Sequence, residues 1–160
     1  MTETRWLNTS EQQVWRLFLT ATSALFGSLD RQLQSEAGIP HAYYEILVRL
    51  SEAPERTLRM RDLADRSSYS RSRLSHAVAR LESMGWVRRT ECADDRRGLL
   101  AVLTDEGFAA LQSAAPGHVE AVRRLLLDPL TPEQVQQLGE ISAAVVRGAA
   151  GDACGSDSAA

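Results

Sequence analysis

The fold of this chain is decided by residues 58–104, which read LRMRDLADRSSYSRSRLSHAVARLESMGWVRRTECADDRRGLLAVLT. Apolar residues recur at helical spacing in the first part, and a turn near Ser70 leads into a second helical segment that ends at Gly85. After Gly85 the spacing becomes that of two strands, 86–91 and 99–103. This order predicts a helix-turn-helix followed by a β-hairpin wing.

The second helical segment has two chemically different faces. Leu74, Ala77, Val78 and Leu81 form one apolar stripe on a helical wheel. The other side and its margins carry small polar or basic residues: Ser70, Arg71, Ser72, Arg73, Ser75, His76 and Arg80. Small side chains let a helix approach base edges, and arginines reach guanine or phosphate. The pattern therefore predicts a reader of the DNA major groove, with a plain solvated face as the equal alternative for this helix taken alone.

Residues 92–98 read CADDRRG and join the two strands. The segment is too charged to pack inward, so it should project into solvent as a wing. Arg97 suits a narrow minor groove, where the negative potential is enhanced, and Asp95 is placed to hold its guanidinium. Arg96 adds a second cation, although a charged hairpin tip is the alternative reading. Three further arginines are expected to hold DNA phosphates: Arg56, Arg88 and Arg89.

The distribution of charge agrees with a DNA-binding centre. The 160 residues carry a net charge of −3, which by itself would disfavour nucleic acid. Between residues 56 and 97, however, 11 Arg stand against 6 acidic residues, so this segment carries +5 and the remainder −8. All 18 basic residues are Arg, which suits bidentate contacts with phosphate and guanine, with a coding bias as the alternative explanation.

These motifs resemble the winged helix-turn-helix of the MarR (multiple antibiotic resistance regulator) family. They are LRMRDLA at 58–64, Leu74 with LESMGWVRR at 81–89, DRRG at 95–98 and LT at 103–104. Asp95 and Arg97 match the family's Asp-x-Arg wing signature, whereas His76 stands where the family frequently has Arg. The resemblance covers about residues 9–149 and implies a mainly α fold with a small β-hairpin wing. It also implies a homodimeric transcriptional regulator, usually a repressor, that binds a palindromic operator in double-stranded DNA.

Long helical segments flank the DNA-binding lobe. Thr9 or Ser10 is expected to cap the first helix, with Gln12 or Gln13 three residues on. The last helix begins with the capping motif Thr131-Pro132-Glu133-Gln134. A winged helix needs neither segment to close its own core, so their apolar stripes are expected to pack against a second copy, as the resemblance also implies.

The expected organisation is one MarR-like domain over residues 1–160. Its parts are dimerisation helices at 9–36 and 104–149, a DNA-binding lobe at 40–103 and a disordered Gly/Ala/Ser-rich tail at 150–160. The long outer helices are thus assigned to dimer formation and the centre to DNA.

Five residues of the first two helices form an aromatic group: Trp15, Phe18, His41, Tyr43 and Tyr44. MarR-like dimers commonly respond to small aromatic or phenolic ligands between the dimerisation helices and the DNA-binding lobe, and these residues would line such a cleft. Ordinary core and dimer packing is the alternative. A ligand would act by population shift, binding the dimer whose recognition helices are wrongly spaced and so lowering operator affinity.

The cysteines and histidines offer weaker alternatives. Cys92 leaves a thiol-based redox sensor open, but the family's peroxide-sensing branch has its reactive cysteine near the N-terminus, where this chain has none. Cys154 lies in the expected tail. The three histidines, at positions 41, 76 and 118, lack metal-ligand spacing, so neither a metal nor a cofactor is expected.

Two other functional classes are alternatives to DNA binding. The sequence has no phosphate loop or nucleophile elbow, so no catalytic residue is expected and an enzyme is the weaker class. A winged-helix protein-interaction module stays open, because the net charge is negative. No segment has the length and apolarity of a membrane span, and the N-terminus lacks the features of a signal peptide, so a cytoplasmic location is expected.

Overall fold

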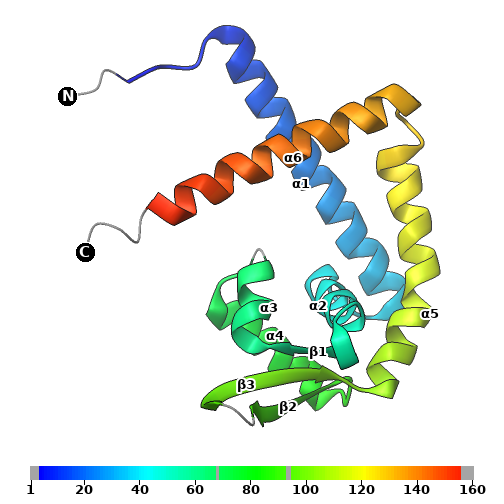
Figure 1. Cartoon of the computed structure of the whole chain (residues 1–160). Helices are drawn as coiled ribbons and strands as arrows, with labels where there is room; N and C mark the ends of the chain where they lie inside the picture. Colours follow the sequence, from blue (N-terminus) through cyan, green and yellow to red (C-terminus); the bar gives the residue numbers. More distant parts are fainter. Residues whose placement is uncertain (1–3, 68, 93–94, 156–160) are drawn as a thin grey trace. The chain divides into compact units, whose positions relative to one another are not determined.

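The computed structural model describes residues 4–67, 69–92 and 95–155, with the side chains of 66, 95–97 and 150–155 outside this description. The chain divides into two compact units, Met1–Ala121 and Val122–Ala160, each of which is described by itself. The chain is mainly helical with one small antiparallel sheet (Figure 1), which confirms the predicted fold class. None of the described helices has the length and apolarity needed to cross a membrane.

The first helix, α1, spans Thr9–Ala37 and begins one residue earlier than the predicted caps allow. Its N-cap is Asn8, not Thr9 or Ser10. The Asn8 side chain accepts a hydrogen bond from the Glu11 N–H at 2.9 Å, and the Glu11 carboxylate accepts one from the Asn8 N–H at 2.8 Å. This reciprocal box places a negative charge in the first turn, where the helix dipole favours it.

The DNA-binding lobe contains three helices and three strands. The helices are α2, His41–Ser51, α3, Met60–Arg66, and α4, Arg71–Ser83. The strands are β1, Thr57–Arg59, β2, Val87–Cys92, and β3, Asp95–Leu103, in the order β1-β3-β2. The helix-turn-helix and the hairpin were predicted from the sequence, and β1 was not.

Strand pairing makes the wing more regular than the sequence indicated. β1 runs antiparallel to β3 and places Leu58 opposite Ala101. β2 occupies the other edge of β3, and the pairing shifts between Glu91 and Cys92. Because β2 reaches Cys92 and β3 begins at Asp95, most of the joining segment that was expected to be a loop is strand.

A continuous apolar core fixes the position of α4 within the lobe. Its most completely buried side chains come from α1, α2, α3, α4 and the sheet: Leu33, Ile46, Leu47, Leu50, Leu63, Leu74, Val78, Leu81, Val87, Ala101 and Leu103. Full burial of one such leucine contributes about 1.5–3 kcal/mol. Among the described residues no polar or charged side chain is buried, so the hydrophobic effect dominates this core.

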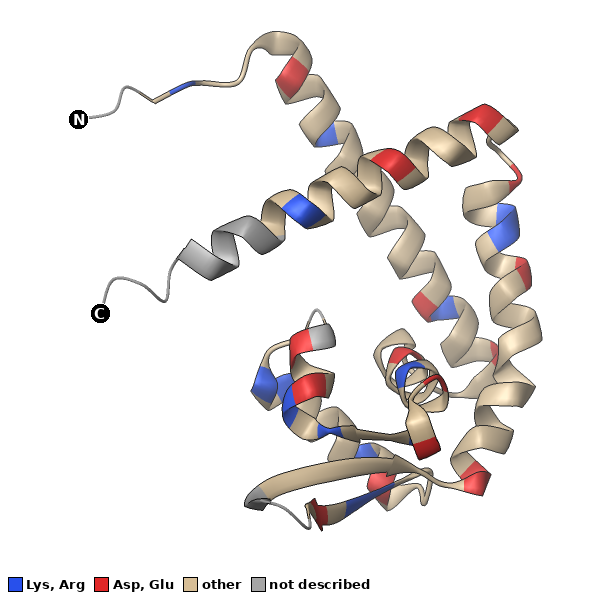
Figure 2. Cartoon of the chain, in the orientation of Figure 1, with Lys and Arg blue, Asp and Glu red and all other residues tan. Residues whose placement is uncertain are grey.

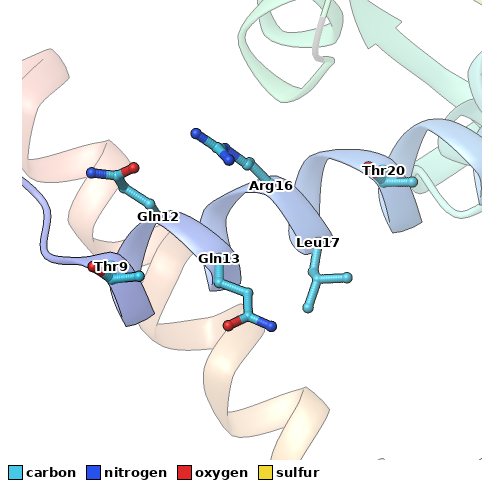
Figure 3. Close-up of a pocket in the computed structure, with 6 residues that line it drawn as sticks. All are labelled: Thr9, Gln12, Gln13, Arg16, Leu17 and Thr20. Atoms are coloured by element: carbon cyan, nitrogen blue, oxygen red, sulfur yellow. The ribbon is translucent and has the colours of Figure 1, made fainter.

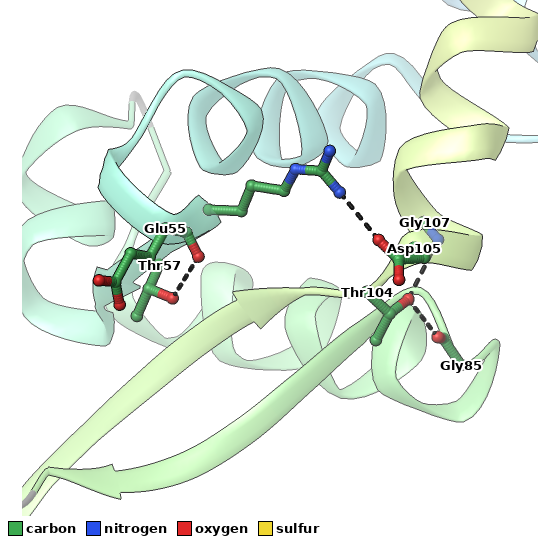
Figure 4. A network of polar contacts seen from close by, with 7 residues as sticks. Glu55, Thr57, Gly85, Thr104, Asp105 and Gly107 are labelled. Atoms are coloured by element: carbon green, nitrogen blue, oxygen red, sulfur yellow. Dashed lines mark hydrogen bonds and ion pairs between the residues drawn. The ribbon is translucent and has the colours of Figure 1, made fainter.

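Hydrogen bonds around Thr104 join the wing to α5, Asp105–Val122. The Thr104 hydroxyl donates to the Gly85 carbonyl at 2.7 Å and accepts from the Gly107 N–H at 3.0 Å (Figure 4). Gly107 is required because a Cβ at this position would lie 2.1 Å from the carbonyl oxygen of Trp86. Gly85, with φ of 76°, makes the left-handed turn that ends α4.

The second unit contains a π-helical turn, Arg123–Leu127, and α6, Pro132–Gly155. The predicted cap of α6 is confirmed: Thr131 N–H donates to Gln134 Oε1 at 2.9 Å, and Gln134 N–H donates to Thr131 Oγ1 at 3.3 Å. The structure extends α6 to Gly155, and the disorder expected for residues 150–160 stays a prediction. Residues 156–160 lie outside the described residues.

Candidate nucleic-acid interface

The helix α4 turns one side to the core and the other to solvent, as its sequence predicts. Its apolar stripe, from Leu74 to Leu81, is at most 9% exposed. The exposed residues are small or basic: Arg71, Ser72, Arg73, Ser75, His76 and Arg80. Ser70 is the N-cap, and its hydroxyl accepts a hydrogen bond from the Arg73 N–H at 3.3 Å. The exposed face thus combines hydroxyl groups with cations on a helix held firmly from behind.

Basic residues gather on the same part of the lobe. Figure 2 shows the Lys and Arg positions of this lobe mainly on α3, α4 and β2. On β2, Val87 and Cys92 are buried while Arg88 is exposed, so this strand directs one arginine to solvent beside α4. Arg88 is therefore accessible, and its contact with a DNA phosphate stays a prediction.

Arg89 occupies a different position from its neighbour. Its Nε and Nη2 donate to Glu82 Oε2 at 2.8 and 2.6 Å, and its backbone N–H donates to Glu82 Oε1 at 3.2 Å. These hydrogen bonds from Arg89 hold the pKa of the Glu82 carboxyl below its usual value. The guanidinium predicted to hold phosphate is thus engaged within the protein, where it ties the end of α4 to β2.

Arg56 is likewise engaged within the protein. Its Nη1 donates to Asp105 Oδ1 at 3.1 Å, along the dashed line that reaches Asp105 in Figure 4. Its guanidinium carbon also lies 3.8 Å from the centroid of the Phe108 ring. Arg56 ends a 3-10 turn, Pro54–Arg56, with a left-handed φ of 54°. The ion pair and the ring hold the guanidinium between this turn and α5, and the phosphate contact of Arg56 stays a prediction.

The three wing residues of the predicted site are Asp95, Arg96 and Arg97. The structure places their backbone at the start of β3. Their side chains lie outside the described residues. The predicted pairing of the Asp95 carboxylate with the Arg97 guanidinium therefore stays a prediction.

Tyr69 belongs to this site although the sequence marked it only as a turn residue. Its hydroxyl donates to Glu45 Oε2 of α2 at 2.9 Å. Burial, and then the hydrogen bond to Glu45, raises the pKa of Tyr69 to about 12, so the hydroxyl remains a donor at neutral pH. Because Tyr69 directly precedes the N-cap Ser70, this bond attaches the start of α4 to α2.

The predicted aromatic group is not a single cluster. Trp15 and Phe18 stack on α1 with ring centroids 6.4 Å apart, and both are about half exposed. His41 instead contacts Phe26, which lies eight residues, or about 12 Å, farther along α1 than Phe18. Tyr43 packs against the core. The structure therefore separates Trp15 and Phe18 from the other three.

Neither of the separated residues lines the hollow nearest to them. That hollow, of about 410 Å³, runs along one side of α1 (Figure 3). The residues that line it include no aromatic side chain: Thr9, Gln12, Gln13, Arg16, Leu17 and Thr20. An aromatic ligand would find no ring there to stack on.

His41 and Tyr44 meet a residue that the sequence left unassigned. The His118 ring of α5 lies 4.4 Å from the Tyr44 ring and 5.5 Å from the His41 ring, measured between centroids. These three residues line a hollow of about 340 Å³, together with Glu45, Val48, Arg49 and Glu52. Sequence spacing could not bring the two histidines together, because α5 returns to α2 only in the folded chain.

The structure gives the burial of Cys92 and the grouping of the possible metal ligands. Cys92 is a free thiol, 8% exposed, at the end of β2. The side chain of Cys154 lies outside the described residues. Within the part of the chain that the structure describes, no three His, Cys, Asp or Glu residues are grouped as metal ligands.

Comparison with known proteins gives one consistent family. Residues 37–98 match the family model described as MarR family. The solved structure of Sco3205, a MarR family transcriptional regulator from Streptomyces coelicolor in complex with DNA, is 55% identical and superposes with a TM-score of 0.88 over 92% of each chain. AbsC, a MarR family transcriptional regulator of the same organism, is 42% identical with a TM-score of 0.86, over 92% of this chain and 99% of that one. The HTH-type transcriptional regulator YfiV of Bacillus subtilis is 28% identical over 84% of this chain and 81% of its own length.

Proposed function

The chain belongs to the MarR family of DNA-binding transcriptional regulators, and we propose that α4 is its recognition helix, which reads a specific operator in the major groove. The observation that carries this proposal is the division of α4 into a fully buried stripe and an exposed basic and hydroxyl face. Ser72, Ser75 and His76 would face base edges, while arginines at its margins reach guanine or phosphate. Sco3205, at 55% identity, was solved in complex with DNA, which supports this assignment.

The wing would add contacts outside the major groove. Arg97 would enter the minor groove with Asp95 holding its guanidinium, and Arg96 and Arg88 would contact phosphates. Replacing Arg97 by Ala should weaken operator binding by about 1–3 kcal/mol without changing the folded state. An unchanged affinity in a salt-controlled titration would remove the wing from the interface.

A second copy of the chain would complete the DNA-binding unit. Each of the two outer helices carries large exposed apolar side chains: Val14, Trp15, Leu17, Phe18 and Leu19 on α1, and Ile141, Val145 and Val146 on α6. Soluble monomers rarely expose such stripes, so a homodimer would bury them. A two-fold dimer presents two copies of α4 to half-sites about 34 Å apart, which requires a palindromic operator.

The hollow beside His41, Tyr44 and His118 is the place where a small effector would act. Its rings suit an aromatic or phenolic molecule, and it lies between α2 and α5. A ligand that binds only the dimer with wrongly spaced recognition helices would release the operator by population shift, as in a repressor. Such a regulator acts where the chromosome lies, in the cytoplasm.

The proposal is tested with duplexes selected by the protein from random-sequence DNA. Affinity for the selected duplex should fall on the order of tenfold or more in Arg73→Ala. The matched control is Arg124→Ala, an exposed arginine of the second unit, which should bind as the wild type does. Equal affinity of both variants would contradict the role of α4. A binding slope against salt near zero would favour a protein-interaction module instead.

A further inference from the structure

Two imidazoles from different helices meet inside the first unit. His41 begins α2 and His118 lies on α5, and their ring centroids are 5.5 Å apart. The Tyr44 ring covers His118 at 4.4 Å, and the Phe26 ring of α1 meets His41 nearly edge-on at 5.7 Å. The two aromatic rings thus cover part of the histidine pair, and both imidazoles are half-buried, which reduces the water that could stabilise a charge there.

His118 is unsuited to carry a proton in this arrangement. Its Nδ1 is buried and has no hydrogen-bond partner among the described residues. Burial lowers the pKa of the His118 imidazole, the charge of His41 lowers it further, and Glu45 acts in the opposite direction. A protonated His118 would place a second N–H donor in the hollow and would require an acceptor.

Several charged groups lie near the histidine pair. From α1, the Asp30 carboxylate accepts a hydrogen bond from the backbone N–H of His41 at 2.9 Å. Glu36 Oε2 accepts a hydrogen bond from the Gln32 side-chain amide at 2.8 Å and lies close to Gly117. From α2, the hollow is lined by Arg49 and two carboxylates, Glu45 and Glu52. Of these carboxylates, Glu45 is the one whose charge acts on His118.

Glu45 also makes the contact that anchors the start of α4. It accepts the Tyr69 hydroxyl at 2.9 Å, and Tyr69 directly precedes Ser70, the N-cap of α4. One carboxylate is therefore shared between the histidine hollow and the attachment of α4 to α2. Whatever draws Glu45 toward the imidazoles removes the acceptor from Tyr69.

We propose that protonation of the His41–His118 pair draws Glu45 away from Tyr69, loosens the start of α4 and lowers operator affinity. The inference rests on the proposed role of α4 as recognition helix. The new buried N–H of His118 and the added positive charge both favour a carboxylate acceptor, and Glu45 lines the same hollow. Proton uptake at α5 thereby reaches the start of α4 through Glu45 and Tyr69.

The sign of the effect follows from proton linkage. The DNA-binding state disfavours protonation of His118, so the loosened state binds more protons, and operator affinity falls as the pH drops through the pKa of His118. The loss is about tenfold for each unit by which the pKa of the imidazole differs between the two states. His76 is another imidazole, exposed on the proposed base-reading face of α4. The test therefore uses His76→Gln as its background.

The experiment measures fluorescence anisotropy of a duplex selected from random-sequence DNA, from about pH 8 to about pH 5.5 at constant ionic strength. The His76→Gln protein should lose affinity on acidification. Adding His118→Phe should remove this pH dependence. Adding Tyr69→Phe should weaken binding at pH 8 and make the affinity nearly independent of pH. A change of affinity with pH that persists in both double variants would overturn the proposal. A His76→Gln protein whose affinity does not change with pH would also overturn it.

A measurement on the wild-type fold guards against variants that do not fold. NMR titration of the His118 imidazole, with and without the selected duplex, should show a lower pKa in the DNA complex. An identical pKa in both states would contradict the link. The affinity of Arg73→Ala at pH 8 distinguishes failure of the proposed function from failure of the pH link. Unchanged affinity would refute α4 as the recognition helix. A loss of affinity would support that role, and the pH data then test the link between His118 and α4 by themselves.

Discussion

Arg89 holds both carboxylate oxygens of Glu82, with two guanidinium hydrogen bonds to Oε2 and a backbone N–H bond to Oε1. The pair connects the last turn of α4 to β2, so the recognition helix and the wing are fixed to one another. About a third of each side chain is exposed, which limits the contribution of the ion pair through solvent screening. The ion pair fixes the orientation of α4 relative to β2 as well as contributing to stability.

Replacing Arg89 and Arg88 by alanine should have different effects. Arg89→Ala should lower the free energy of unfolding by about 1 kcal/mol, because it removes an ion pair with two guanidinium hydrogen bonds to one carboxylate oxygen, partly shielded from water. Arg88→Ala should leave stability unchanged and lower DNA affinity, since this side chain is exposed. Urea unfolding and a binding titration on the same preparations give both quantities. Equal stability of the two variants would argue against the structural role of Arg89.

The contribution of Glu82 should depend on pH. Its pKa is lowered from the ordinary 4.5 by the hydrogen bonds from Arg89, so its stabilising effect is complete above that ordinary value. The effect is lost as the pH falls through the lowered pKa. The difference in unfolding free energy between wild type and Glu82→Gln should therefore shrink toward zero in acid. In an Arg89→Ala background the same substitution should show no such pH dependence.

Two glycines should respond oppositely to alanine. At Gly107 a Cβ would lie 2.1 Å from the Trp86 carbonyl oxygen and 2.9 Å from Leu103 Cδ1, so Gly107→Ala should cost about 3 kcal/mol or prevent folding. At Gly139 of α6 a Cβ meets nothing within 4 Å, so Gly139→Ala should stabilise the helix by about 0.5 kcal/mol. Thermal unfolding of both variants makes the comparison. A tolerated Gly107→Ala would show that the wing and α5 approach less closely than the structure places them.

The dimer proposal predicts which apolar side chains matter for association. Ile141 of α6 is 58% exposed in a single chain, and a charge there should split the dimer and weaken operator binding. Leu99 of β3 is also exposed, at 44%, but belongs to no long apolar stripe. Sedimentation should therefore show a monomer for Ile141→Glu and a dimer for Leu99→Glu. A wild-type monomer at micromolar concentration would rule out this model.

Local sequence was sufficient where the interactions are local. The buried and exposed faces of α4 follow from a helical repeat, and the Thr131 cap of α6 involves a partner three residues away. The cap of α1 was misplaced by one residue, because Asn8 and Glu11 compete with other cap-forming residues beside them. β1 was missed since three residues carry too little periodicity to mark a strand.

Contacts with residues distant in the sequence determine which of the predicted arginines are held within the protein. The guanidinium of Arg56 is chemically suited to bind phosphate. Only the folded chain brings α5 close enough to supply the Asp105 carboxylate and the Phe108 ring that hold it. Arg89 meets Glu82 because a tight turn reverses the chain between them. A sequence pattern shows which residues are charged, whereas the fold determines which charges remain available to DNA.

The most direct test of α4 as the base-reading helix is the DNA preference of a His76 variant. Preferred duplexes should be selected from random-sequence DNA with wild type, His76→Arg and Arg88→Ala. His76→Arg should change the preferred base at symmetric positions of two half-sites about one helical turn apart, while Arg88→Ala should lower affinity evenly across sequences. Identical base preferences for wild type and His76→Arg would contradict the assignment of the exposed α4 face to the major groove.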